Sequence, residues 1–360
     1  MALAAPSTLC SAAMTSATVG AYAAELREIG DGAFAYLQSN PSWGWSNAGL
    51  VTSLGESLLV DTLYDLNLTR RMLDEMRRRT PAADDIDTVV NTHANGDHCW
   101  GNQLLRDTDI VSSRRAAEEM REFSPALMST LVGAARLAVG LGATARRVTG
   151  LLGRIGVPRA LAFGDAAQFV VDKFGAFEFA GIELCPPTTT FDGRLTLNVG
   201  DKEVHLIEVG PAHTRGDAIV HVPADRTVFT GDILFIGSHP IAWDGPVANW
   251  IAACDRLLSL DVDTVVPGHG PMTDKAGVRR IKEYWQWLLA EARARFDAGL
   301  SSDDAAIDIA RSGLGSFADW GDRERIAVNV DTIYREIRGD RSRRDPLALL
   351  ARMATFSRRS

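Results

Sequence analysis

Residues 88–98, Thr88-Val-Val-Asn-Thr-His93-Ala-Asn95-Gly-Asp97-His98, decide the fold of this chain. Val89 and Val90 predict the end of a buried strand, and Gly96 favours a tight loop directly behind it. That loop carries four side chains that can bind a metal ion: His93, Asn95, Asp97 and His98. Imidazole and carboxylate groups bind Zn²⁺ when several loops bring them to one point. The stretch therefore predicts a metal site whose remaining ligands lie elsewhere in the chain.

Three later stretches each close an apolar, strand-like run with one more candidate ligand. They are Gly210-Pro-Ala-His213, Phe229-Thr-Gly231-Asp232 and Val265-Val-Pro-Gly268-His269. Together with the first loop, they make the chain resemble the metallo-β-lactamase superfamily over roughly residues 28–290. The pattern of that superfamily is a His-X-His-X-Asp-His loop followed by a single His, a bridging Asp and a final His. Motifs that match in the same order are far more specific than any one of them.

The resemblance implies two metal sites that share Asp232. The first site would be formed by His93, Asn95 and His213, and the second by Asp97, His98 and His269. Asn95 departs from the pattern, because it stands where the superfamily has the second His of the loop. An amide oxygen is a weaker donor to zinc than imidazole, so we expect the second site to fill first. Zn²⁺ is the expected metal, at one or two ions per chain, with iron or manganese as alternatives.

The resemblance also implies catalysis by a hydroxide that the metal activates, with Asp97, Asp232 and Asn95 as the catalytic side chains. Either carboxylate can orient the water and pass a proton to the leaving group, and the residues alone do not choose between them. Asn95 can instead hydrogen-bond the attacking water or a substrate carbonyl.

Other polar and aromatic residues near the motifs receive separate predictions. We expect His239, Trp243 and Trp100 to contact substrate, although an aromatic residue beside an apolar run more often belongs to the core. Asp61 resembles the superfamily's structural Asp, which supports the metal loop by hydrogen bonding. Asp217 is expected to play a similar part or to cap the next turn. Residues expected to be scaffold or buried rather than ligands are His205, His221 and Cys99.

Composition narrows the class of protein. The chain has 360 residues, 46% of them hydrophobic, and a formal net charge of −8. The negative charge and the lack of a Lys/Arg stripe beside the motifs argue against a nucleic-acid partner. The four cysteines are widely spaced and form no Cys-X-X-Cys pair, and no export signal is recognisable, so we expect a cytoplasmic enzyme.

The order of patterns predicts an α/β, four-layer αββα fold with a helical insertion and C-terminal helices. We expect a disordered tail over residues 1–24, a catalytic domain over 25–300 and a C-terminal helical extension over 301–360. The ligands run from residue 93 to residue 269, so a single domain must hold them all. Turn residues at 191–193 and 198–201 predict hairpins. Helices are expected near 67–79, 113–121, 248–259, 273–298, 301–312 and 323–338, with an exposed salt-bridged face on the last and a frayed Arg-rich end.

The insertion, about residues 122–182, is rich in Ala, Gly and Leu. Arg136 and several Gly residues within its apolar stretch argue against a membrane span. A helical cap over the metal loops would favour a bulky hydrophobic substrate. The alternative is a helical pair that only packs on the core or forms a homodimer.

The resemblance implies a zinc-dependent hydrolase that cleaves an ester, thioester, lactone or amide bond of a small molecule, and the apolar insertion favours a hydrophobic one. Thioester and lactone are the first candidates, and the acyl group could be linked to coenzyme A or a carrier protein. The alternatives are a thioesterase or cyclase of natural-product biosynthesis, an iron-dependent redox enzyme of the same superfamily, and a non-catalytic binding protein.

Overall fold

A computed structural model of the chain describes residues 24–40, 42–141, 158–342 and 344–360. The tail expected over residues 1–24 lies outside the described residues except for Ala24, which begins the first strand.

The first sheet has seven strands in sequence order, β1 to β7. The first four strands pair antiparallel, and β4 to β7 pair parallel. The strands are β1 (Ala24–Gly30), β2 (Ala33–Gln38), β3 (Ala48–Ser53), β4 (Glu56–Val60), β5 (Thr88–Val90), β6 (Asp109–Ser113) and β7 (Thr189–Phe191).

The second sheet has five strands in the order β12-β11-β10-β9-β8. Neighbours pair antiparallel except β11 and β12, which are parallel. The strands are β8 (Arg194–Val199), β9 (Lys202–Glu208), β10 (Ala218–Val222), β11 (Thr227–Phe229) and β12 (Thr264–Val266).

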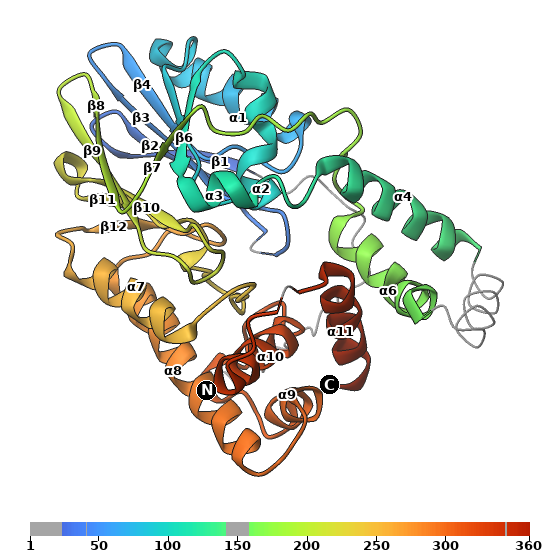
Figure 1. The fold of residues 1–360 in the computed structure, drawn as a ribbon. Helices are drawn as coiled ribbons and strands as arrows, with labels where there is room; N and C mark the ends of the chain where they lie inside the picture. Colours follow the sequence, from blue (N-terminus) through green and yellow to red (C-terminus); the bar gives the residue numbers. More distant parts are fainter. Residues whose placement is uncertain (1–23, 41, 142–157, 343) are drawn as a thin grey trace, which may run out of the picture.

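The two sheets pack face to face, and helices cover their outer faces (Figure 1). Side chains alternate along each strand, so Val90 joins the apolar core between the sheets while Val89 packs under helix α1 (Leu66–Arg79). In the second sheet, Val220 joins the same inner core, and Ile219 belongs to the outer cluster. This confirms the predicted four-layer αββα fold.

The remaining helices are α2 (Gly96–Cys99), α3 (Arg114–Glu119), α4 (Pro125–Gly140), α6 (Pro158–Phe174), α7 (Val247–Ser259), α8 (Lys275–Asp297), α9 (Ser302–Arg311), α10 (Arg325–Arg338) and α11 (Pro346–Arg359). Helices α2, α3 and α7 to α10 follow the expected positions within a few residues, α4 and α6 lie in the expected helical insertion, and α11 was not expected.

One of the two predicted hairpins is wrong. The turn at Asp192 and Gly193 joins β7 of the first sheet to β8 of the second, so it crosses between sheets. The turn at Gly200 and Asp201 does close a hairpin, in which Val199 pairs with Lys202. Both turns carry turn-forming residues, and only the packing of the two sheets distinguishes them.

Helices α4 and α6 lie within the insertion and pack against each other, and α6 also packs against the C-terminal helix α11 (Figure 1). Residues 142–157 between them lie outside the described residues. Among the described residues, no helix combines the length and the apolar character needed to cross a lipid bilayer.

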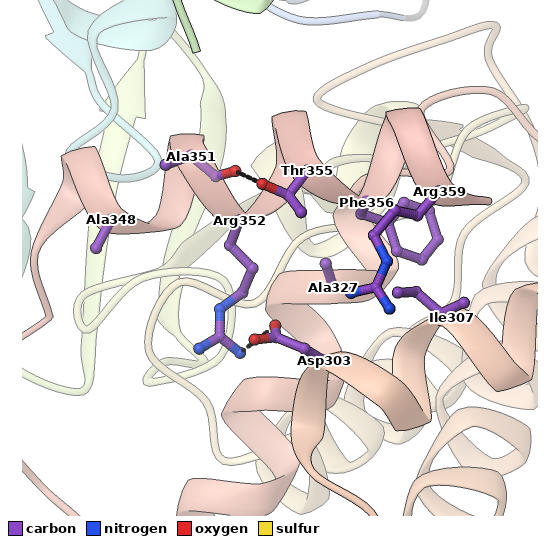
Figure 2. A pocket seen from close by; sticks show the side chains of 9 residues that line it. All are labelled: Asp303, Ile307, Ala327, Ala348, Ala351, Arg352, Thr355, Phe356 and Arg359. Carbon is purple, nitrogen blue, oxygen red and sulfur yellow. Dashed lines mark hydrogen bonds and ion pairs between the residues drawn. The ribbon is translucent and has the colours of Figure 1, made fainter. Parts of the chain in front are cut away.

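The C-terminus is helical, and the prediction of a frayed end is wrong. Helix α11 buries Leu349, Leu350, Met353 and Phe356 against the neighbouring helices. Figure 2 shows Arg352 of α11 reaching Asp303 of α9, with 3.1 Å between the charged atoms, across a cavity of about 330 Å³. That cavity lies among the C-terminal helices and contains none of the predicted metal ligands.

The charged face expected on α10 is only partly exposed. Asp331 forms ion pairs with Arg344 at 2.7 Å and with Arg352 at 2.8 Å, and its side chain is 15% exposed. These pairs tie α10 to α11 and to the chain before it, whereas the sequence predicted pairs facing solvent.

Candidate metal centre

The predicted ligands meet at one edge of the two sheets. His93 and His98 follow β5, His213 lies between β9 and β10, Asp232 follows β11, and His269 follows β12. The ligand atoms form two groups, each within 4.8 Å, that could hold a metal ion: His93, His213 and Asp232, and Asp97, His98 and His269.

Asp232 lies between the two groups. Its Oδ2 is 3.2 Å from His213 Nε2 and 3.7 Å from His93 Nε2. Its Oδ1 is 3.1 Å from His98 Nε2 and 3.4 Å from His269 Nε2, and Asp97 Oδ2 is 3.3 Å from the same nitrogen of His269. One carboxylate oxygen therefore faces each group, as a bridging ligand requires.

Several of these ligand atoms are sealed from water without a hydrogen-bond partner. Within the described part of the chain, His93 Nε2, His98 Nε2 and Asp232 Oδ1 make no hydrogen bond. A buried polar atom left unpaired costs roughly 1–3 kcal/mol, so a cluster of them is unfavourable unless something binds there. Imidazole nitrogens and carboxylate oxygens are suitable ligands for a divalent transition metal, and this donor set fits such an ion.

Supporting groups fix the orientation of the histidine rings. Asp61 Oδ2 lies 2.9 Å from His98 Nδ1, and it accepts hydrogen bonds from the Thr92 hydroxyl at 2.7 Å and, through Oδ1, from the Thr92 amide at 2.7 Å. Thr92 Oγ1 is in turn 3.0 Å from His93 Nδ1. Asp61 adopts a left-handed backbone with φ of 63°, an unfavourable conformation that its contacts maintain. This confirms that Asp61 supports the metal loop, whereas the part of Thr92 was not predicted.

His213 is held by its own backbone partner. Its Nδ1 donates to the Ile241 carbonyl at 2.7 Å, which leaves Nε2 with the lone pair. That Nε2 lies 2.9 Å from Asn95 Nδ2, so the amide of Asn95 donates to it. Asn95 therefore reaches the first group of ligands as predicted, but through its amide nitrogen. In this conformation it competes with a metal for His213.

Burial and charge set the protonation of the ligands. Burial lowers the pKa of His213 to about 4 and the pKa of His93 well below its usual range, so both rings are neutral near pH 7. Burial alone would raise the pKa of Asp232, but the surrounding histidines, His269 and His98 foremost, hold it well below its usual range. Burial would lower the pKa of His98 and His269 as well, but Asp232 and the carboxylates of Asp61 and Asp97 raise both values, so these two rings must release a proton when a metal binds, whereas His93 and His213 are already neutral.

Two glycines let the loops approach this closely. A Cβ atom at Gly268 would lie 2.0 Å from Asp232 Oδ1, and one at Gly96 would lie 2.4 Å from the ring of Trp100. Larger residues at either position would displace a ligand loop, so the glycines beside Asp97 and His269 are steric requirements.

Trp100 and His239 lie deeper than a surface contact with substrate requires. Trp100 is 2% exposed and stacks on Tyr64, with 5.2 Å between ring centres, and its ring packs closely against Gly96. His239 is 0% exposed and packs between Tyr284 and Trp320. Their predicted substrate contacts remain predictions that this buried placement does not favour.

The scaffold predictions agree with the structure. His205 of β9 and His221 of β10 pair with each other across the second sheet, and neither belongs to a ligand group. Cys99 directs its thiol to the Ala94 carbonyl at 3.6 Å, and Asp217 accepts hydrogen bonds from the amides of Ala212 and Thr214 on either side of His213. Asp217 therefore shapes the His213 loop.

Aromatic residues adjoin the loops on the partly exposed side of the centre. Among the ligand residues, Asn95 and Asp97 are partly exposed, while the others are buried. Ser46, next to the partly exposed Trp45, donates its hydroxyl to the Asp97 carbonyl at 2.5 Å, and the amide of Trp243 donates to the His213 carbonyl at 3.0 Å. Beyond them, Phe174 and Phe177 of the insertion segment pack on Trp43 and Trp45.

Comparisons with known proteins identify relatives of this arrangement. The sequence model of the metallo-β-lactamase superfamily matches residues 42–269. The alpha subunit of 2,4-dinitroanisole O-demethylase from Nocardioides sp. (strain JS1661) is 31% identical over 138 residues, which are 37% of this chain and 38% of that protein. Acyl-coenzyme A thioesterase MBLAC2 from Homo sapiens is 28% identical over 94 residues, which are 24% of this chain and 33% of that protein. The matches thus span only about a third of the length of these relatives.

Among solved structures, the inverting sec-alkylsulfatase Pisa1 from Pseudomonas sp. shares the fold with a TM-score of 0.58 and 16% identity. The match covers 87% of this chain and 50% of that one, so it extends beyond the residues that the family model matches.

Proposed function

Because this chain belongs to the metallo-β-lactamase superfamily, we propose that it is a metal-dependent hydrolase acting on a small, hydrophobic acyl substrate, with a thioester as the first candidate. The observation that carries the proposal is the pair of buried His/Asp groups that meet at Asp232, in which His93 Nε2, His98 Nε2 and Asp232 Oδ1 make no hydrogen bond. Such a donor set has no use in packing, because each unpaired atom destabilises the fold.

In this proposal, His93, Asn95, His213 and Asp232 hold a first metal ion, and Asp97, His98, His269 and Asp232 hold a second. A bound divalent ion would lower the pKa of a water molecule toward neutrality and polarise the carbonyl under attack. Asp61 and Thr92 keep the rings of His98 and His93 turned so that their Nε2 atoms face inward.

Asp97 is the better candidate for moving the proton. Its side chain is 13% exposed, whereas that of Asp232 is 3% exposed and lies between four histidines. A general acid must reach the leaving group, so Asp97 is the carboxylate that can orient the water and then protonate the departing thiolate or alkoxide. Asn95, on the same partly exposed side, can donate its amide hydrogens to the substrate carbonyl.

The aromatic surroundings support a hydrophobic substrate. Trp45 adjoins Ser46, which contacts Asp97, and Trp243 contacts His213 through its backbone amide. Both tryptophans are partly exposed, and Phe174 and Phe177 pack on Trp43 and Trp45, so these rings would form an apolar wall. An acyl chain or aromatic ring entering there would bury apolar surface worth roughly 25 cal/mol per Å². The thioesterase relative acts on acyl-coenzyme A, which agrees with this choice.

The test is hydrolysis of a panel of acyl-coenzyme A thioesters and lactones of increasing chain length by protein of measured metal content. We expect metal-dependent thioester cleavage that improves with chain length and falls by about 100-fold or more in Asp97→Ala. Trp287→Phe, a substitution in the C-terminal half of α8 and outside the ligand groups, controls for effects that any substitution and purification could have on the measured activity. Metal-loaded protein that cleaves none of the panel would refute the proposal, and bound iron with an oxygen-dependent reaction would favour the redox alternative.

A second candidate is removal of an alkyl group from an aromatic ether. It is favoured by the O-demethylase relative, which has the longer match of the two. The same apolar wall would accept an aromatic ring. Release of 2,4-dinitrophenol from 2,4-dinitroanisole, followed by its absorbance, would favour this reaction over thioester cleavage.

A further inference from the structure

The orientation of His213 depends on an irregular segment of chain, here called the Ile241 loop (residues 239–243). The Ile241 carbonyl accepts the hydrogen bond from His213 Nδ1 at 2.7 Å, and the amide of Trp243 donates to the His213 carbonyl at 3.0 Å. The loop contains no helix or strand, so its backbone groups need partners from elsewhere.

Those partners come from the C-terminal extension. Asn329 of α10 accepts from the Ala242 amide through Oδ1 at 2.9 Å and donates through Nδ2 to the Pro240 carbonyl at 2.8 Å. The amide of Asn329 therefore binds the two residues on either side of Ile241, in the way a neighbouring strand would. Asn329 is 0% exposed, and its Nδ2 also lies within 3.2 Å of the Tyr284 hydroxyl.

Further groups of the same extension hold the rest of the loop. The Thr332 hydroxyl donates to the Ala242 carbonyl at 2.8 Å, and Arg344 Nη1 donates to the Trp243 carbonyl at 3.1 Å. Arg325 Nη1 donates to the His239 carbonyl at 2.8 Å. The loop that orients a candidate metal ligand is thus fastened along its length by residues more than eighty positions away.

We infer that Asn329 is a positioning residue for His213, and that the C-terminal extension completes the first metal site although it provides no ligand. The inference rests on the proposed function in one respect, namely that His213 binds a metal. Without Asn329, the Ala242 amide and the Pro240 carbonyl would be buried unpaired, and the loop would shift to recover partners. The Ile241 carbonyl would then no longer fix the Nδ1–H form of His213, and Nε2 would lose its defined lone pair.

The experiment compares Asn329→Leu, which keeps the size but removes both hydrogen bonds, with Val330→Ala as a matched control on the same helix. Val330 is 0% exposed, so the control destabilises α10 without touching a hydrogen-bonding group. Two quantities are measured: the tautomer of His213 by nitrogen-15 NMR of metal-free protein, and the affinity of each site for Co²⁺ by titration of its absorption bands.

For Asn329→Leu we expect a mixture of His213 tautomers and a loss of about 10–100-fold in affinity at the site of His93 and His213. Affinity at the site of Asp97, His98 and His269 should stay within about twofold of the parent, and Val330→Ala should leave both quantities at parental values. If Asn329→Leu does not fold, Thr332→Val removes one hydrogen bond to the same loop and should produce a smaller change of the same kind.

The outcomes separate the two claims. The positioning role would be overturned if the His213 tautomer and the Co²⁺ affinities of Asn329→Leu and Thr332→Val were the same as those of Val330→Ala. A parent protein that binds no Co²⁺, while Asn329→Leu still changes the His213 tautomer, would refute the metal-dependent function and leave the positioning role supported.

Discussion

At the scale of single residues, Asn95 has the greatest effect on this metal centre. Its amide donates to His213 Nε2 at 2.9 Å, and the Ile241 carbonyl already occupies the other ring nitrogen. The first site therefore has to break a hydrogen bond before His213 can bind a metal.

Replacing Asn95 by His should convert this donor into a third imidazole ligand. We expect Asn95→His to raise the affinity of the first site by about tenfold or more and to bring the metal content toward two per chain, because imidazole is a stronger zinc ligand than an amide. Elemental analysis after dialysis against limiting zinc measures the change. Asn95→Ala is the control, since it frees His213 without adding a ligand, and metal content that is the same in all three proteins would contradict the prediction.

Glu119 of α3 predicts a pH dependence of stability outside the ligand set. Burial raises its pKa to about 7, although it accepts a hydrogen bond from the Arg215 amide at 3.0 Å. A carboxyl whose pKa is raised in the folded state stabilises the fold fully below its unfolded pKa. That contribution is lost as the pH rises through about 7.

Glu119→Gln should remove this dependence. Relative to the parent protein, the variant should gain roughly 2 kcal/mol in free energy of unfolding between pH 5 and pH 8, since glutamine carries no charge to bury. Urea denaturation at both pH values gives the comparison. Glu122→Gln is the exposed control, and a stability difference between Glu119→Gln and the parent that does not change with pH would count against the raised pKa.

At the scale of elements, the insertion and the C-terminal extension are joined by a nearly buried ion cluster. Lys173 of α6 lies 3.0 Å from Asp322 and 2.7 Å from Glu324, and Glu324 also accepts a hydrogen bond from the Trp43 indole at 2.9 Å. Trp43 belongs to the segment between β2 and β3 that supports the aromatic wall. Three parts of the chain that are distant in sequence therefore meet at this ion cluster.

Lys173→Met should lower the free energy of unfolding by about 2–3 kcal/mol, because Glu324 loses its counter-charge in a mostly buried place and Asp322 is left with Arg325, 3.3 Å away. Arg136→Met on α4 is the matched control. Arg136 donates to the Gly175 carbonyl at 2.8 Å at an exposed position, and its loss should cost about 0.5 kcal/mol or less. Chemical denaturation provides both values, and equal losses would show that the ion cluster contributes little.

At the scale of the whole molecule, the metal centre lies where both sheets and the segments beyond them meet. Its ligands come from the loops after β5, β11 and β12 and from the loop before β10. Any ion that binds only the folded chain must therefore stabilise the entire domain, by an amount that grows with its free concentration.

Removing metal should lower the melting temperature of the whole chain in one cooperative step. With zinc at about 100 times its dissociation constant, the stabilisation is about 2.7 kcal/mol, which corresponds to several degrees. Calorimetry of chelated and zinc-supplied protein measures it, and Asp232→Ala should lose most of the difference because Asp232 contacts both ligand groups. A melting temperature that zinc does not change would argue against an ion at this place.

Much of the fold could be predicted from local pattern. The apolar runs before His93, Asp232 and His269 indicated strands, and the Gly residues beside them indicated tight loops, because side-chain period and backbone freedom are properties of neighbouring residues. Helices such as α1 and α8 followed from the spacing of their apolar residues in the same way. The order of the motifs was enough to identify the superfamily and to predict the candidate ligands, which the structure brings together in two groups.

Contacts between residues far apart in the chain were decided only by the tertiary structure. These include the crossing of the chain from one sheet to the other at Gly193 and the packing of α11 on its neighbours. They also include the hydrogen bonds of Asn95 with His213 and of Asn329 with the Ile241 loop. No local pattern marks Asn329, because an asparagine within a helix looks the same whether it faces water or a buried loop. The sequence alone determined most of the elements and the candidate ligands, whereas the direction in which each polar side chain points depends on which distant backbone groups lack a partner.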